Sequence, residues 1–363
     1  MSRPVHGGNL AWAAGLASCA PAELLDFSAS ISPLGPPHSV QEAVQADFLS
    51  VRHYPDPNYG ALRGAIAQHH KVPIEYITPG NGAAELLTWA ARELAQMTQC
   101  FCLSPGFSDY ARALQAFGCI PTKLFLQNST SWEALVLDQS VNLQRCGLLL
   151  NNPHNPTGDL FDREKIRLLL SKLGLLVVDE AFMDFLPPER EQSVIDWVSE
   201  FENLVVIRSL TKFYSMPGLR LGYAIAHPKI IKRWQKWRDP WSVNTLAISA
   251  GIAALQDTKF QRQTWDWLEV ANAQLYKGLA TVPDLSPHPG CANFLLVNCR
   301  KSVMALQEGL LKQHRIYIRD CMSFEGLGDR YFRVAIKTQA ENLRLVSAIA
   351  QILPTLPEAN NAR

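Results

Sequence analysis

The stretch that decides the fold reads Ser209-Leu210-Thr211-Lys212-Phe213-Tyr214-Ser215-Met216-Pro217-Gly218-Leu219-Arg220-Leu221-Gly222-Tyr223. It lies just after the apolar run Leu204-Val205-Val206-Ile207, which has the length and composition of a short buried strand. Hydroxyls precede a single lysine in this stretch, and glycines and an arginine follow it. Backbone N–H groups, hydroxyls and a guanidinium bind phosphate oxygens well, so the stretch predicts a phosphate-bearing ligand at this strand end.

The position of Lys212 also suits covalent chemistry. A desolvated lysine near other positive charges loses its proton more readily and becomes a nucleophile toward a carbonyl group. The alternative is a solvent-exposed lysine in a surface loop. Two further strand ends in the sequence favour the chemical role.

The first of these strand ends is Asn151–Gly158, with the sequence NNPHNPTG, which follows the apolar run Gly147–Leu150. The second is Val177–Phe182, an apolar run that ends in the carboxylate of Asp179. Open α/β sheets bind ligands at the carboxyl ends of their parallel strands, so we expect Asn155 and Asp179 to meet at one edge. Taken singly, the asparagine–proline pairs could be turns, and Asp179 could be a helix N-cap.

With the three stretches in this order, most of the chain resembles the class I/II aminotransferase family of fold-type I pyridoxal-phosphate enzymes. The resemblance implies an α/β fold, with a large domain whose mostly parallel mixed sheet is flanked by helices and a smaller α+β domain. We expect residues 46–255 to form the large cofactor-binding domain and residues 256–363 the small domain. Residues 1–45 should complete the small domain and cover the site.

The same resemblance implies three catalytic residues and the cofactor pyridoxal 5'-phosphate. Lys212 should carry the cofactor covalently, Asp179 should keep its pyridine nitrogen protonated, and Asn155 should donate to its 3-oxygen. Phe107 follows another apolar run and matches the position where the family stacks an aromatic ring on the pyridine, although it could be an ordinary core aromatic.

A phosphate cup is predicted around Gly80 and Gly82, where a strand-like run turns into a helix. These glycines let the backbone approach an anion, and the helix start offers unpaired N–H groups. A plain strand-to-helix turn would explain the glycines equally well. By resemblance, six residues contribute to the cup: Asn81, Gly82, Ala83, Ser209, Thr211 and Arg220.

Tyr54 begins the stretch Tyr54–Arg63, which reads as a turn followed by a helix. In the family, the first tyrosine of such a stretch reaches the cofactor phosphate of the other subunit. The resemblance therefore implies a homodimer, with Tyr54 as a cofactor-binding residue.

Arg333 lies in the middle of the apolar run Tyr331–Ile336, where a charged side chain needs a carboxylate or phosphate partner. In the family, this arginine binds the substrate α-carboxylate. Arg319, on the neighbouring predicted strand, is a second candidate substrate ligand, and its alternative is a simple ion pair with Asp320.

Two groups within the family are similar to this chain, and both act on small amino compounds that carry a phosphate ester. One group decarboxylates L-threonine O-3-phosphate for cobalamin synthesis, and the other transfers the amino group of histidinol phosphate. The start His6–Asn9, the segment Asp26–Gly35, and Phe182 in place of a tyrosine favour the decarboxylases. Four further residues are therefore candidate substrate ligands: His6, Gly8, Ser30 and Ser32. The decarboxylases usually have asparagines at the two serine positions.

Composition excludes several other classes. The 363-residue chain has a formal net charge of +1 and 47% hydrophobic residues, which gives no electrostatic reason to expect a nucleic acid or an anionic membrane as partner. The eight cysteines form no CxxC pair, and we predict no metal site. We expect a reduced, cytoplasmic protein with a first helix after residue 9 rather than a lipoprotein signal ending at Cys19. A cofactor-binding regulator without turnover is the remaining alternative, but such regulators usually carry an added DNA-binding domain.

Overall fold

The computed structural model describes residues 3–126 and 142–359. Within these residues, seven strands form the larger sheet, in the order β2-β8-β7-β6-β5-β3-β4. β8 is antiparallel to both of its neighbours, and the other pairs are parallel. The strands are β2 (Ile77–Asn81), β3 (Gln99–Ser104), β4 (Thr122–Phe125), β5 (Cys146–Asn151), β6 (Leu175–Asp179), β7 (Leu204–Ser209) and β8 (Leu221–Ala226).

The central strands of this sheet are apolar on both faces because helices cover both sides. Neighbouring residues of one strand therefore belong to different cores: Val177 packs in one cluster and Val178 in another. One face packs against α4 (Ala83–Leu94), α5 (Ser108–Gln115) and α8 (Pro228–Trp237). The other face packs against α3 (Gly60–His70), α7 (Arg163–Leu170) and α9 (Thr245–Gln256). α2 (His38–Ala46) lies against α9.

A second body contains an antiparallel sheet, which in the described part of the chain has the strand order β12-β13-β10-β9. Its elements are β9 (Leu285–Pro287), β10 (Phe294–Cys299), β12 (Arg319–Cys321), β13 (Gly328–Ala335), α11 (Val303–His314) and α12 (Gln339–Ile352). The N-terminal segment joins this body: β1 (Leu25–Asp26) pairs in parallel with β11 (Ile316–Tyr317), and α1 (Leu10–Ala17) packs on α11.

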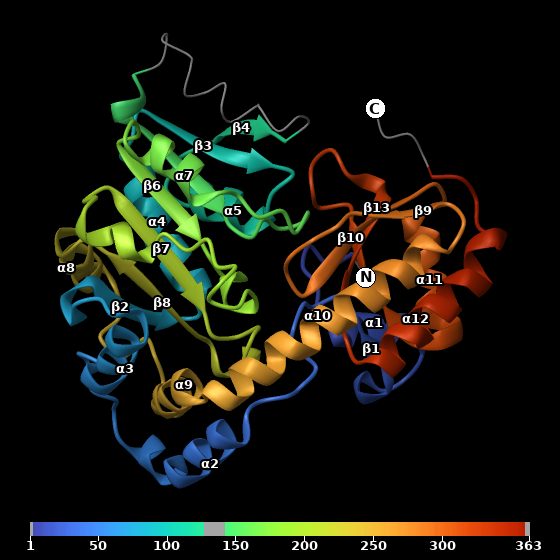
Figure 1. The fold of residues 1–363 in the computed structure, drawn as a ribbon, viewed down its shortest axis with the longest axis horizontal. Helices are drawn as coiled ribbons and strands as arrows, with labels where there is room; N and C mark the ends of the chain where they lie inside the picture. The colour runs from blue at the N-terminus through green and yellow to red at the C-terminus, as the bar shows by residue number, and fades with distance from the viewer. Residues whose placement is uncertain (1–2, 127–141, 360–363) are drawn as a thin grey trace.

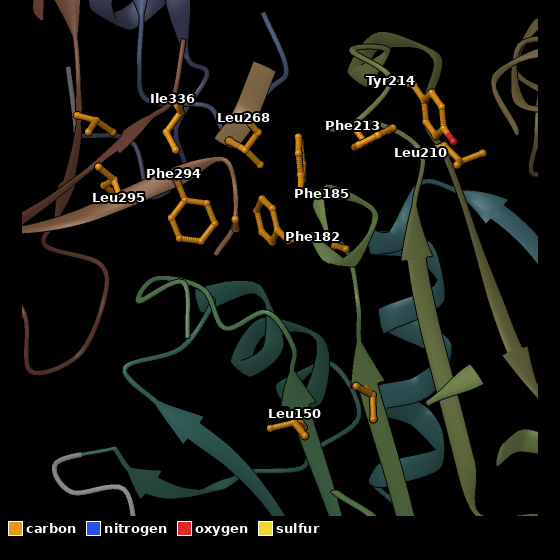
Figure 2. Packing of buried hydrophobic residues seen from close by; sticks show 14 of the residues in the cluster. Leu150, Phe182, Phe185, Leu210, Phe213, Tyr214, Leu268, Phe294, Leu295 and Ile336 are labelled. Atoms are coloured by element: carbon orange, nitrogen blue, oxygen red, sulfur yellow. The ribbon is translucent and has the colours of Figure 1, made fainter. Parts of the chain in front are cut away.

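The long helix α10 (Thr258–Ala280) runs from one body to the other, as Figure 1 shows. Between the bodies lies a group of aromatic and aliphatic side chains (Figure 2). The rings of Phe182, after β6, and Phe294, at the start of β10, meet edge to face with centroids 4.9 Å apart. One hydrophobic cluster includes residues of both sheets, so the two bodies share a continuous core.

None of the described helices combines the length and the apolar character that a membrane crossing requires.

Candidate active site

A cavity of about 200 Å³ lies at the carboxyl edge of the large sheet, facing the small sheet. Predicted site residues of the large sheet and its loops line one side of it: Phe107, Asn155, Asp179 and Lys212. Predicted residues from the N-terminal segment and the small sheet line the other side: His6, Ser30, Arg319 and Arg333. Other cavities in the described part of the chain are larger, at about 550, 490, 360 and 290 Å³, so size alone does not locate the site.

Asp179 is the last residue of β6, and its carboxylate is buried. Its Oδ1 accepts from the Ala181 N–H at 3.0 Å, and its Oδ2 accepts from the Tyr110 hydroxyl at 2.6 Å. Burial raises the pKa of Asp179, while Tyr110, Lys212 and the Ala181 N–H act in the opposite direction. The carboxylate is thus fixed in orientation at the floor of the cavity.

Lys212 follows β7 by three residues, and its ammonium group lies 4.7 Å from the centroid of the Phe182 ring. Burial lowers the pKa of Lys212, and so do the positive charges of Arg333 and Arg220, whereas Asp179 raises it. The backbone carbonyl of Lys212 accepts from the Ser32 N–H at 3.0 Å, which ties the lysine loop to the N-terminal segment. A lysine in this setting is a better nucleophile than one in water.

Asn155 is held by the end of β5, because its N–H donates to Asn151 Oδ1 at 2.7 Å. Asn151 in turn donates to the backbone carbonyl of Asp179 at 2.8 Å. The side-chain oxygen of Asn155 accepts from Arg333 Nη1, so its amide N–H groups can donate to a ligand. This contact joins the two bodies across the cavity.

Arg333 and Arg319 are direct partners in the β12–β13 register, so the two guanidinium groups lie on adjacent strands beside the cavity. Burial lowers the pKa of Arg333 to about 10, and its Nε has no hydrogen-bond partner among the described residues. Arg319 donates to the backbone carbonyl of Val5 and to Ser323 Oγ, the latter at 2.6 Å. Its separation from Asp320 is 4.0 Å, the outer limit of an ion pair.

The N-terminal segment brings only part of its predicted residues to the cavity. The exposed His6 ring lies 5.5 Å from Phe107, and burial of part of the ring lowers its pKa. Ser30 Oγ is buried and, within the described ranges, unpaired. Gly8 and Ser32 do not line the cavity. The Gly8 N–H donates to Ser28 Oγ at 2.8 Å, and Ser32 supports the lysine loop.

The predicted phosphate-cup residues meet next to the cavity because β8 is antiparallel between β2 and β7. Leu221 of β8 pairs with Asn81, and Gly222 pairs with Ser209. The hydroxyls of Ser209 and Thr211 lie 2.7 Å apart. Ala83 begins helix α4 and its nitrogen lies close to β8, because a Cβ atom placed at Gly222 would be 2.7 Å from it.

Gly82 and Arg220 form the most constrained contact of this cup. Gly82 has a φ of +76°, and a Cβ atom placed there would lie 2.3 Å from Arg220 Nη2. Only glycine therefore lets this guanidinium lie over the helix start. The Asn81 N–H already donates to Glu85 Oε2 at 2.6 Å, so it is not free to bind a phosphate oxygen.

Tyr54 lies away from the cavity of its own chain. Its side chain is 78% exposed and stacks on Trp241 with ring centroids 4.4 Å apart. Tyr110, which contacts Asp179, was not among the predicted site residues. A tyrosine on a helix 69 positions before its partner leaves no local sequence signal. Among the described residues, no group of histidine, cysteine or acidic side chains could hold a metal ion.

Comparisons with known proteins agree with this geometry. A family profile described as "Aminotransferase class I and II" matches residues 22–349. The threonine-phosphate decarboxylase of Salmonella typhimurium is 39% identical, with 98% of each chain covered. A histidinol-phosphate aminotransferase of Methylobacillus flagellatus is 30% identical, over 92% of this chain and 90% of its own.

A solved structure shows that the fold is shared. It is the histidinol-phosphate aminotransferase of Sinorhizobium meliloti in complex with pyridoxal-5'-phosphate, which superposes with a TM-score of 0.86. It covers 98% of this chain and 96% of its own length at 22% identity.

Proposed function

Because this chain belongs to the class I and II aminotransferase family, we propose that it decarboxylates L-threonine O-3-phosphate with pyridoxal 5'-phosphate as cofactor. The products are CO₂ and (R)-1-amino-2-propanol O-2-phosphate, a building block for cobalamin biosynthesis. The observation that carries this proposal is the similarity, over 98% of both chains, to a threonine-phosphate decarboxylase.

The residues present fit the cofactor. A phosphate group needs N–H donors, hydroxyls and a cation, and the start of α4 at Ala83, together with Ser209, Thr211 and Arg220, supplies them in one corner. We assign the phosphate to that corner, with Asn81 and Gly82 beside it. Phe107, with its ring at the cavity wall, would stack on the pyridine.

Lys212, Asp179 and Asn155 have the catalytic roles in this proposal. When bound, pyridoxal phosphate supplies an electron sink for the bond that breaks at the substrate Cα. Lys212 would hold the cofactor covalently, and its amino group, once the substrate amine has displaced it, would supply the proton that Cα takes up when CO₂ leaves. Asp179 would bind the pyridine N–H, and Asn155 would donate to the ring oxygen with the amide group that Arg333 leaves free.

The paired arginines fit a substrate that carries two anions. Arg333, with an unused Nε, would bind the α-carboxylate, with Arg319 beside it on the neighbouring strand. His6 and the unpaired Ser30 hydroxyl are the further donors at this end of the cavity. Hydrogen bonds to charged groups are worth about 1.5–3 kcal/mol each, so threonine without phosphate should be a far poorer substrate.

We also propose that the enzyme acts as a homodimer in the cytoplasm. Tyr54 belongs to a group of exposed apolar side chains that a second subunit would cover: Phe48, Leu49, Val51, Tyr54 and Trp241. The eight cysteines are all free, which favours a reducing compartment. Light scattering that finds a fully active monomer, or a Tyr54→Phe variant with unchanged cofactor affinity, would refute the shared site.

A second candidate activity is transfer of the amino group of histidinol phosphate to 2-oxoglutarate, which the 30% identical relative makes worth testing. The replacement of a tyrosine by Phe182, whose ring lies against Lys212, weighs against it. The deciding experiment supplies each substrate separately and follows CO₂ and glutamate. Threonine phosphate should release CO₂ without a keto-acid partner. Glutamate formed from histidinol phosphate, with no CO₂ from threonine phosphate, would assign the aminotransferase activity instead.

A further inference from the structure

The Tyr110 hydroxyl makes a contact that the packing of its ring does not require. It is the third residue of α5, and its ring is buried against Phe107, edge to face, with centroids 5.4 Å apart. Within the described part of the chain, its hydroxyl has one hydrogen-bond partner, Asp179 Oδ2, at 2.6 Å. This distance is typical of a hydroxyl that donates to an ionised carboxylate.

At Asp179, every hydrogen bond of the carboxylate is donated by a neighbouring group. Both carboxylate oxygens accept, one from Tyr110 and the other from the Ala181 N–H. Protonation of either oxygen would weaken the hydrogen bond that it accepts, because a neutral carboxyl group is a poorer acceptor than a carboxylate, so the arrangement favours the anion. Burial raises the pKa of Tyr110 well above 10, so its hydroxyl remains a donor at neutral pH.

Few titratable groups face this pair. Lys212, after β7, and Tyr110 face the Asp179 carboxylate. Tyr110 in turn faces Cys102 of β3 and its neighbour Asp109. Burial alone would push Asp179 toward its neutral form, and the Tyr110 hydrogen bond acts against this.

We propose that Tyr110 is a positioning residue whose hydroxyl holds the Asp179 carboxylate ionised and correctly rotated to bind the pyridine N–H of the cofactor. The inference rests on the proposed cofactor and adds a residue to the proposed machinery. Tyr110 acts through Asp179 rather than on the substrate. Its effect must therefore disappear when Asp179 can no longer be ionised.

The experiment compares Tyr110→Phe with a matched control, Tyr223→Phe. Tyr223 is equally buried on β8, lies outside the cavity, and its hydroxyl is 2.7 Å from His70 Nε2. Each variant loses a single oxygen atom from a buried ring. Pyridoxal phosphate is titrated into each apoprotein from pH 5 to 9 and followed by its visible absorption. Thermal unfolding of each apoprotein checks the fold.

Tyr110→Phe should bind pyridoxal phosphate about 10- to 100-fold more weakly at neutral pH. Its affinity should also fall at a higher pH on acidification, because Asp179 then takes up a proton more readily. Tyr223→Phe should match the wild type in both measurements. In an Asp179→Asn background, the Tyr110→Phe change should have no further effect, since the hydrogen-bonded anion is already absent.

Unchanged affinity and pH profile in Tyr110→Phe would overturn the inference, and so would a full additional loss in the Asp179→Asn background. Normal cofactor binding by Asp179→Asn alone would overturn it as well, because Tyr110 would then have nothing to act through. Failure of the proposed substrate is distinguishable, since turnover of histidinol phosphate instead of threonine phosphate leaves all these binding results standing.

Discussion

The two sides of the β6–β7 strand pair carry charges of very different kinds. Asp179 lines the cavity, while Arg208 lines a different cavity and pairs with Glu180, the residue that follows Asp179. In this second group, which we call the back cluster, Arg208 binds Glu180 at 2.9 Å and also contacts Asp184 and Glu191. On the cavity side, Arg333 reaches an amide but no carboxylate among the described residues.

The pKa values reflect this difference. Burial opposes the charge of Arg208, yet the three carboxylates raise its pKa well above the ordinary value of an arginine. Burial also lowers the pKa of Arg333, and no carboxylate compensates, so the value falls to about 10. The back cluster is therefore satisfied within the chain and stabilises the strand ends. In the cavity, Arg333 has no carboxylate partner in the part of the chain that the structure describes, as expected of a group that binds an anionic ligand.

The largest effect is expected from Lys212→Ala. Removal of the covalent attachment point should lower turnover on the order of 10⁴- to 10⁶-fold, as loss of a catalytic nucleophile does elsewhere. The free energy of unfolding of the apoprotein should not fall, because a desolvated ammonium group is removed. Steady-state kinetics measures the loss of turnover, and denaturant unfolding measures the stability of the apoprotein.

The control for this variant is Lys236→Ala, at an exposed position of α8, which should change neither quantity. Borohydride reduction of the wild-type enzyme, followed by peptide mapping, should place the cofactor on Lys212. A label on another lysine would contradict the assignment.

Arg208→Met should have the next largest effect, on stability. It leaves three carboxylates without their cation in a buried setting, which costs about 3–5 kcal/mol. Urea unfolding of the apoprotein measures the change. Adding Glu180→Gln should recover part of the loss, because it removes one of the unpaired charges. A loss below about 1 kcal/mol would mean that the back cluster is not structural.

Unlike Arg208→Met, Arg333→Met should not lower the free energy of unfolding. The guanidinium is buried without a carboxylate, so its replacement should leave the free energy of unfolding unchanged or higher. The kcat/KM for threonine phosphate should fall about 10- to 100-fold, the value of a hydrogen bond to a charged group. Destabilisation as large as that of Arg208→Met would remove the distinction between the two sides.

The sequence predicts the strand-end residues because they are local features. Lys212, Asp179 and Asn155 each follow an apolar run, and parallel strands bring their carboxyl ends to one edge. The mid-strand position of Arg333 was also predicted from its local sequence, and the structure places it within β13.

Contacts between distant segments leave no such signal. The bond from Tyr110 to Asp179 depends on how α5 packs on the sheet, and the contacts of Arg208 depend on the loop after β6. Ser32 shows the reverse case. Its donor chemistry made it a candidate substrate ligand, but the backbone path directs it to the lysine loop.

An ion pair at the junction of the two bodies, between His288 and Asp159, should give the smallest effect. His288 Nε2 lies 2.7 Å from Asp159 Oδ1, and the side chains are 43% and 41% exposed. Their contribution to stability should therefore stay below about 1 kcal/mol. Asp159 lies four residues after Asn155, so the pair ties the asparagine loop to the small sheet.

The pH dependence of this pair follows from both pKa values. The hydrogen bond to Asp159 raises the pKa of His288, so its contribution is complete below the unfolded value of about 6.5 and is lost as pH rises through the folded value. Burial raises the pKa of Asp159, but the bonds from His288 and Thr157 outweigh this and lower it. The carboxylate contribution is thus present above about pH 4 and is lost only as pH falls further.

His288→Gln should consequently reduce the free energy of unfolding most between about pH 4 and 6.5, and the difference from the wild type should vanish at higher pH. Urea unfolding at several pH values measures this difference. His38→Gln is the control, because the His38–Glu42 pair is 82% and 67% exposed and should contribute nothing measurable. A stability difference that grows above pH 8 would contradict the ion pair. A difference above about 3 kcal/mol would make this half-exposed pair as stabilising as the buried Arg208 cluster. Solvent exposure would then not explain which ion pairs stabilise the fold.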